Sequence, residues 1–294
     1  MSSMFLNTDV LVQILACVNY SDLPSLCRVD STFYELASDR LYHHICYPDV
    51  LRVCYTLLFR PALAAKVRHF KIPHCTSEPQ RCWSTLSAVG KALRAMTGLQ
   101  SLHVADSDVP SWVLRHCPFR VITFSFAAQC DADLVEFLER QEQIQDLVLG
   151  PHIPNLVLKP TALPKLTKVK ARASLLSILV PGRPVRDVIF NDTSHCTEID
   201  VKFLSHSIAP IQRLSIVAEN VYTLPISQFV AIVPHLHVLI VNFPFVGSRD
   251  TWVSLFTFSL TTFDDNICAS EQLGPSHSGW LPWFLFFWNF ATSL

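Results

Sequence analysis

The chain begins with apolar residues at the spacing of an amphipathic helix. They recur at i, i+1, i+4, i+5 and i+8, which places them together on one side of a helix. The residues are Val10, Leu11, Ile14, Leu15 and Val18. Thr8 is expected to cap this helix, with Asp9 in the first turn, where a carboxylate interacts favourably with the helix dipole.

A second short helix is predicted after the segment 19–22, whose polar residues interrupt the first pattern. Ser21 is expected to cap it. Pro24 fits its first turn, where a missing N–H leaves no hydrogen bond unmade. The apolar residues expected to face the first helix are Leu23, Leu26 and Val29.

A third helix is expected to begin at Asp30 or Ser31, and Thr32 with Glu35 has the spacing of a capping box. Its apolar residues are Phe33, Leu36 and Ala37. The three helices form a small bundle. A bundle of this size buries little surface and usually needs a partner.

The order of residues in these helices resembles the F-box motif. In that family a Leu-Pro pair precedes an acidic residue and a Leu-rich helix, followed by an Asp-Leu turn, a Leu-x-x-Val step and a helix with an aromatic residue and a Leu-Ala pair. The matching segments are Phe5–Leu15, Ser21–Ala37 and Leu41–Tyr42. Asn7 stands where the family usually has proline, so we expect a less preorganised turn and weaker adaptor binding.

The resemblance implies that the N-terminal helices dock onto a Skp-type adaptor and through it join a cullin-RING ubiquitin ligase. The residues that would form or support this docking surface are Leu6, Asp9, Leu11, Ile14, Leu15, Leu23, Leu26, Val29 and Phe33. The alternative is that these residues are only the core of a helical cap.

After a predicted helical connector around residues 48–67, the pattern Leu-x-x-Leu-x-Leu recurs with apolar variants. The copies begin at Leu99, Phe119, Ile144, Leu166, Val185, Ile211 and Leu236. They lie about 19 to 26 residues apart, within the period of leucine-rich repeats, where each unit is a strand followed by a helix or a looser return. The helices between them are predicted at Leu86–Leu93, Asp133–Leu138 and Gln228–Val233.

The same alternation would also suit an α/β domain with a parallel sheet. However, the chain has only seven glycines and contains neither Gly-x-Gly-x-x-Gly nor Gly-x-x-x-x-Gly-Lys, so no phosphate-binding loop is indicated. We therefore favour an irregular solenoid, which resembles the repeats of fungal and plant F-box proteins, with Asn191 just after a strand like the asparagine of the regular repeat. Its concave strand face and rim loops would be the binding surfaces.

The predicted fold class is therefore α+β, a three-helix F-box followed by an irregular strand–helix solenoid that resembles leucine-rich repeats. The predicted boundaries are 1–47 for the F-box helices, 48–85 for a helical or irregular connector, 86–268 for the solenoid and 269–294 for an aromatic-rich tail. The tail from Gly274 either caps the last repeat, is disordered, or results from a gene model that is truncated or reads through an intron. An interfacial membrane anchor is a less favoured alternative.

Composition predicts a folded chain, because half of the residues are hydrophobic and only 16% are charged. The formal net charge is -1 without a Lys/Arg cluster, so nucleic acid is not an expected partner. Met1–Val18 lacks the basic start of a signal peptide, and the ten cysteines are therefore expected to be reduced, buried thiols.

No transmembrane segment is expected. Val221–Ser248 is uncharged but broken by prolines, and the apolar part of Gln272–Leu294 is too short to span a bilayer. The expected location is intracellular, either cytoplasmic, nuclear or both.

No catalytic residue, cofactor or metal is expected. Cys-x-x-Cys, His-Glu-x-x-His and Gly-x-Ser-x-Gly do not occur. His43, His44 and Cys46 are close in sequence, but adjacent residues point to different sides of a helix or strand. Cys17 and Cys27 are expected to act as small hydrophobes on apolar helix faces.

These patterns predict a protein that binds rather than catalyses. We expect a substrate-recognition adaptor of a Skp-cullin-F-box ubiquitin ligase, which captures an unidentified protein target on the repeat region. The alternative is a repeat-based interaction scaffold with no ligase role, whose N-terminal helices cap the solenoid.

Overall fold

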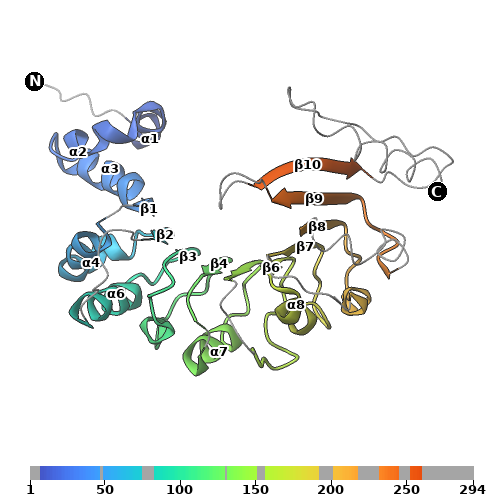
Figure 1. Cartoon of the computed structure of the whole chain (residues 1–294). Coiled ribbons are helices and arrows are strands. Elements are labelled where there is room, and N and C mark those ends of the chain that lie inside the picture. The colour runs from blue at the N-terminus through green and yellow to red at the C-terminus, as the bar shows by residue number, and fades with distance from the viewer. Residues whose placement is uncertain are drawn as a thin grey trace, which may run out of the picture. The chain divides into compact units, whose positions relative to one another are not determined.

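The computed structural model describes residues 7–46, 49–74, 83–129, 131–150, 156–191, 201–217, 232–244 and 252–259 (Figure 1). These residues belong to two compact units, Met1–Leu166 and Thr167–Leu294. Two predicted segments lie outside the described residues: most of the helix at Gln228–Val233, and the tail from Gly274.

The first unit begins with the predicted bundle. Its elements are α1 (Thr8–Cys17), the 3-10 turn η1 (Tyr20–Asp22), α2 (Leu23–Leu26) and α3 (Ser31–His43). Its core is Leu15, Leu23 and Ala37, with Val18, Leu26, Cys27, Phe33, Leu36 and Leu41 partly buried against it. The three predicted helices are confirmed, as is Pro24 in the first turn of α2.

The caps of α2 and α3 differ in part from the prediction. α2 begins after Asp22 without a side-chain cap, so the predicted Ser21 cap is wrong. Asp30 caps α3 by accepting a hydrogen bond from the Phe33 N–H at 2.8 Å. The predicted Thr32–Glu35 capping box is also wrong, because Thr32 lies inside the helix instead of at its cap.

The predicted connector is helical, but two unpredicted strands flank its helices. The helices are α4 (Val50–Phe59) and α5 (Pro61–Ala64), and the strands are β1 (His44–Cys46) and β2 (His69–Ile72). β2 carries a further copy of the repeat pattern, with Val67, Phe70 and Ile72 all buried. The Leu-x-x-Leu-x-Leu pattern therefore also indicates β2.

The strands of the first unit pair in chain order, and all pairs are parallel. β3 (Ser101–Val104), β4 (Thr123–Phe126) and β5 (Asp146–Leu149) continue the pairing of β1 with β2. One buried row in register is Phe70, Leu102, Phe124 and Leu147, and the next is Ile72, Val104, Phe126 and Leu149. Each of these four-residue strands contributes two core side chains, so the core forms only when neighbours stack.

One repeat copy is two residues out of register with the prediction. The prediction names Phe119, Ile122 and Phe124, whereas the structure buries Val121, Phe124 and Phe126 at the equivalent positions. Leu102 pairs with Phe124, and Ile122, which precedes β4, is 40% exposed. Phe119 is buried before the strand, with its ring centroid 6.0 Å from that of Phe137.

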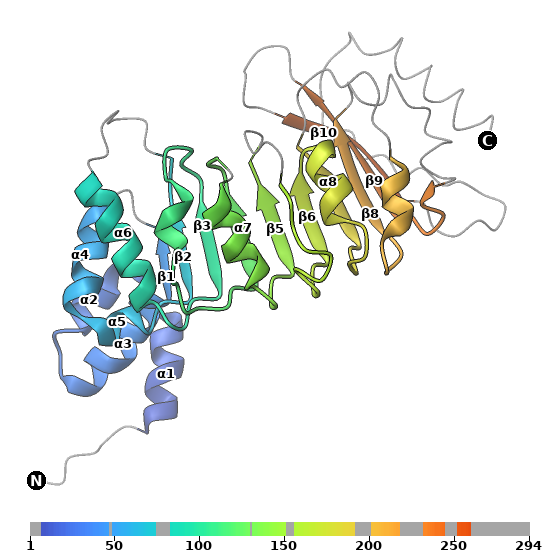
Figure 2. The ribbon, with the colours of Figure 1, turned by 90° about the horizontal axis from the view of Figure 1, so that it is seen from below.

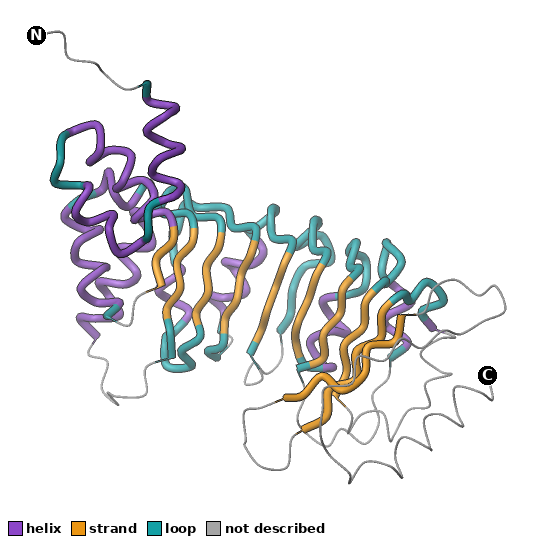
Figure 3. Tube along the Cα trace, turned by 90° about the horizontal axis from the view of Figure 1, so that it is seen from above, coloured by secondary structure: helices purple, strands orange, loops and turns teal. Residues whose placement is uncertain are grey.

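Helices cover one face of these strands. α6 (Trp83–Ala95), the 3-10 turn η2 (Ser111–Leu114) and α7 (Ala132–Glu139) return the chain between strands, and α6 and α7 lie on the same side (Figure 2). Both helices are at the predicted places. Among the described elements of this unit, none covers the opposite face of β2–β5 (Figure 3).

The second unit shows the same alternation. β6 (Lys168–Ala171), β7 (Asp187–Phe190), β8 (Arg213–Val217) and β9 (Val238–Pro244) pair in parallel and in chain order. α8 (Ala173–Leu179) and the 3-10 turn η3 (Lys202–His206) lie between them in the sequence. β10 (Trp252–Ser259), which is not among the predicted strands, pairs antiparallel with β9.

The coarser part of the fold prediction is confirmed, because the chain combines helices with parallel β-structure. All four predicted strand patterns of the second unit coincide with β6–β9. Within the described part of the chain, no helix is long and apolar enough to cross a membrane.

Candidate functional site

α1 begins at a capped N-terminus. The Asn7 side-chain oxygen accepts a hydrogen bond from the Asp9 N–H at 3.1 Å, so the cap lies one residue before the predicted Thr8. Asn7 has a φ of -58°, a value that proline also adopts. The asparagine side chain therefore holds this turn with a hydrogen bond.

α1 carries more apolar surface than the bundle buries. Leu11 and Leu15 are buried, whereas Val10, Val12 and Ile14 are 41%, 49% and 46% exposed. Val10 and Ile14 lie four positions apart and so share one side of the helix, which we call the α1 outer face. Val10 and Val12 are missing from the predicted docking set. The sequence did contain a signal for their exposure: the apolar stripe of this helix is wider than one neighbouring helix can cover.

The predicted docking residues divide between core and surface. Leu11, Leu15 and Leu23 are buried in the bundle, and Leu26 and Phe33 are partly buried against its core. Asp9, Ile14 and Val29 are exposed, and Leu6 lies outside the described residues. Val29, predicted to face the first helix, is instead 60% exposed. The predicted set is thus mainly an internal scaffold, with few members at the surface.

α3 joins the bundle to the strands of the same unit. It runs directly into β1. Lys66 Nζ lies 2.6 Å from the Asp39 carboxylate and donates to Ser38 Oγ at 2.9 Å. The Arg68 N–H donates to the His43 carbonyl oxygen at 3.0 Å. These contacts hold the bundle against β1 and β2.

The strand face opposite the helices carries two rows of side chains in register. One row is His44, His69, Ser101, Thr123 and Asp146, and the other is Cys46, Lys71, His103, Ser125 and Val148. Alternation along each strand separates them from the buried rows. Neither row contains a carboxylate from β1 to β4. We call the group His44, His69, Lys71 and His103 the histidine face.

The imidazoles of this face influence one another. The ring centroid of His69 lies 5.3 Å from that of His43, at the end of α3, and 5.8 Å from that of His44. Burial, together with His43 and His44, lowers the pKa of His69. Burial and the nearby Lys71 ammonium lower the pKa of His103. An anion placed here would oppose both shifts, because it favours the protonated imidazole.

The described residues contain no group of three histidine, cysteine, aspartate or glutamate side chains arranged to hold a metal ion. The cysteines are less uniformly buried than predicted. Cys54 and Cys117 are buried, but Cys17 and Cys46 are exposed. Cys27 packs against the bundle core as expected, whereas Cys17 does not act as a core hydrophobe.

The strand face of the second unit carries an ion pair between neighbouring strands. Asp187 on β7 and Arg213 on β8 are register partners. The Arg213 Nη2 atom lies 3.0 Å from Asp187 Oδ2, and its Nε donates to Asp187 Oδ1 at 3.2 Å. This guanidinium is thus neutralised by a carboxylate of the same face.

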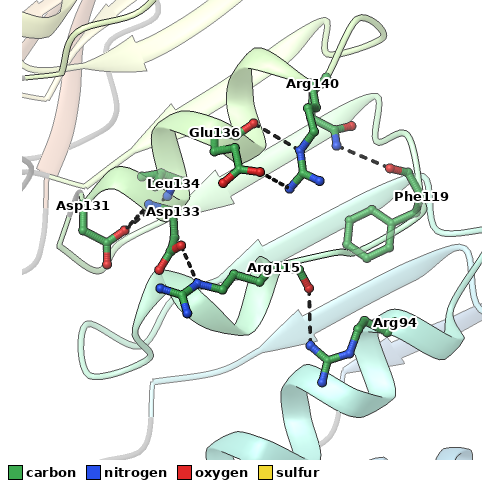
Figure 4. Close-up of polar contacts among 9 residues, drawn as sticks. Arg94, Arg115, Phe119, Asp131, Asp133, Leu134, Glu136 and Arg140 are labelled. Carbon is green, nitrogen blue, oxygen red and sulfur yellow. Dashed lines mark hydrogen bonds and ion pairs between the residues drawn. The ribbon is translucent and has the colours of Figure 1, made fainter.

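Polar contacts also tie together the helix side of the first unit. Arg115 Nε donates to Asp133 Oδ1 at 2.5 Å, and Arg94 Nη1 donates to the Arg115 carbonyl oxygen at 3.3 Å (Figure 4). Asp131 caps α7 by accepting from the Asp133 and Leu134 N–H groups. These contacts link α6, the residues after η2 and α7 to one another, so we regard this network as structural.

The first unit therefore offers two candidate binding surfaces, the α1 outer face and the histidine face. The first is apolar, and the second carries imidazoles and an ammonium group, so they suit partners of different chemistry. No protein-family model matches the chain, and no curated protein matches it.

Proposed function

We propose that the protein is a non-enzymatic adaptor, which docks onto a Skp-type adaptor through its N-terminal helices and holds a protein target on its strand–helix repeats. It would act as the substrate receptor of a cullin-RING ubiquitin ligase. Its contribution is proximity, because it brings the target to a reactive group carried by another subunit.

The observation that carries the proposal is the α1 outer face. Val10 and Ile14 are exposed on a bundle whose own core is already formed by Leu15, Leu23 and Ala37. Contiguous exposed apolar surface is typical of sites that another protein covers. The order of residues in the bundle resembles the F-box motif, which supplies the class of partner.

We also propose that the strands and helices after the bundle are leucine-rich-repeat-like units of a solenoid. Strand pairing in chain order supports this proposal, since each unit then packs only on its neighbours. A doubly wound α/β fold would instead place strands out of chain order and helices on both faces. An open strand face is where solenoids usually bind their partners.

Co-purification of the full chain with a Skp-type adaptor tests the docking. The double change Val10→Asp and Ile14→Asp places two carboxylates on the α1 outer face. In the complex the adaptor would cover both apolar side chains. Losing them weakens binding by about 3 kcal/mol or more, which is more than about a hundredfold in Kd. Val12→Asp is the matched control, because Val12 is equally exposed but lies on another side of α1.

Substitutions at Leu11 and Leu15 do not test docking, because both side chains are buried. A buried aspartate there is expected to unfold the bundle, which circular dichroism would detect. The proposal fails if the folded wild-type protein does not bind the adaptor. It also fails if the Val10/Ile14 variant binds as tightly as the Val12 control.

A repeat scaffold without a ligase role is the second candidate, and the contacts of α3 favour it. The Lys66–Asp39 ion pair and the Arg68–His43 hydrogen bond connect the bundle to β1 and β2, which supports a cap role. In this case the wild-type protein does not bind the adaptor. Lys66→Ala still lowers the free energy of unfolding, because it removes the ion pair with Asp39. Adaptor binding by the wild type separates the two candidates.

A further inference from the structure

Four nitrogen-bearing side chains stand close together on β1–β3. His44 pairs in register with His69, and Lys71 pairs with His103. Neighbouring strands are about 4.8 Å apart, and alternate residues of one strand are about 7 Å apart. The histidine face therefore has the spacing at which an extended peptide presents every second side chain.

The charge of this face is uncompensated. The groups around His69 are His43 from α3, His44 from β1 and the uncharged Ser101 from β3, and the groups around His103 are Lys71 from β2 and the uncharged Ser125 from β4. Among the described residues, Lys71 makes no ion pair. The first carboxylate of the two rows is Asp146, on β5.

We infer that the histidine face binds an acidic segment of a second protein, whose carboxylates contact Lys71, His69 and His103. The inference rests on the proposed function, because it names the class of target that the strand face takes. An acidic peptide fits by charge, and an extended segment with alternate carboxylates fits by spacing. Nucleic acid fits less well, since the chain has a net charge of -1 and the face offers one lysine.

Binding is tuned by pH. At neutral pH Lys71 is the fixed cation of the face, and the lowered pKa values of His69 and His103 keep these imidazoles mainly neutral. Below about pH 6.5 protonation adds positive charge next to Lys71. Affinity for carboxylates therefore rises as the pH falls, and the bound carboxylates in turn raise the pKa of the imidazoles.

Fluorescence anisotropy of a labelled decaglutamate peptide with the full chain, in EDTA and without the Skp-type adaptor, tests the inference. Lowering the pH from about 7.5 to about 5.5 is expected to tighten Kd by about fivefold or more. Lys71→Met weakens binding about fivefold at both pH values, and His69→Gln with His103→Gln removes most of the pH response. A decaglutamine peptide does not bind.

Two control variants match these changes in the same unit. Lys91→Met removes an exposed lysine from α6, on the helix side, and His116→Asn replaces an exposed histidine that follows η2. Both are expected to bind like the wild type. The inference is overturned if the peptide does not bind at either pH, if Lys91→Met weakens binding as much as Lys71→Met, or if a ten-nucleotide oligothymidine binds more tightly than the peptide. Because the assay contains no adaptor, none of these results bears on whether the N-terminal helices dock onto it.

Discussion

At the scale of single residues, burial separates four of the five described cysteines into two chemical classes, and Cys27 is intermediate. Cys17 and Cys46 are exposed, and Cys54 and Cys117 are buried. Burial raises the pKa of Cys117 to about 12, and its Sγ donates to the Val113 carbonyl oxygen at 3.7 Å. The thiolate is the reactive form of cysteine, so reactivity should follow this division.

Alkylation with iodoacetamide at about pH 8 should therefore modify Cys17 and Cys46 more than about a hundredfold faster than Cys117. Peptide mapping by mass spectrometry at several times measures each rate separately. In urea, where burial is lost, the three rates should converge. Equal native rates for Cys117 and Cys46 would contradict the burial of Cys117.

A second residue shows how far burial can depart from residue type. Arg183 is 2% exposed, and its guanidinium donates to the carbonyl oxygens of Ile178 at 2.7 Å and Pro181 at 3.3 Å. Burial lowers its pKa. These acceptors lie at the C-terminal end of α8, where carbonyl groups lack partners within the helix. The buried arginine thus supplies hydrogen-bond donors to carbonyl groups at and just after the end of α8.

At the scale of elements, the end of β5 requires a glycine. A Cβ on Gly150 would lie 2.6 Å from the Ala127 carbonyl oxygen and 2.7 Å from the Ala127 Cα. These are backbone atoms. They cannot move aside easily, because the Gly150 N–H donates to the Phe126 carbonyl oxygen at 2.8 Å. The adjacent strand ends therefore approach closely at this position.

Gly150→Ala should lower the free energy of unfolding by about 2 kcal/mol, the usual scale of overpacking. Gly90→Ala is the matched control, because a Cβ at this position in α6 would lie 3.4 Å from the Val113 backbone. It should be neutral or stabilising by up to about 1 kcal/mol, since alanine favours a helix. Urea denaturation followed by circular dichroism compares the two. If both alanine variants match the wild type, the close approach at Gly150 is wrong.

Local periodicity predicted most elements of the chain, because the spacing of apolar residues within a short segment distinguishes a strand from a helix. It failed where two patterns overlap, as at Phe119 and Val121, since only pairing with β3 selects the register of β4. It also failed at the N-terminus of α1. Asn7 and Thr8 are both suitable capping residues, and the backbone conformation makes Asn7 the cap.

At the scale of the whole molecule, the histidine face should make stability depend on pH. The pKa values of His69 and His103 are lower in the folded protein than the usual value of about 6.5. Between the lowered values and about 6.5 the unfolded chain binds more protons, so stability rises with pH through this window and is constant above it for these groups.

The urea midpoint of the wild-type protein should therefore fall when the pH is lowered from about 7.5 to about 5.5. The double variant His69→Gln and His103→Gln should show a smaller fall, because glutamine stays uncharged at both pH values. The difference between the two proteins isolates these histidines from the other ten in the chain. An identical pH dependence would show that their pKa values are not lowered.

The sequence by itself determined the elements of this protein: three N-terminal helices, the strands β3–β9 and the helices α6 and α7. These depend on interactions within a few residues, which apolar spacing and turn residues encode directly. Only the tertiary structure decided which apolar residues of α1 remain exposed, where β4 lies in register, and that Arg183 is buried. The histidine face also belongs to this second group. Its members come from separate segments, and the pairing of β1, β2 and β3 is what brings them together.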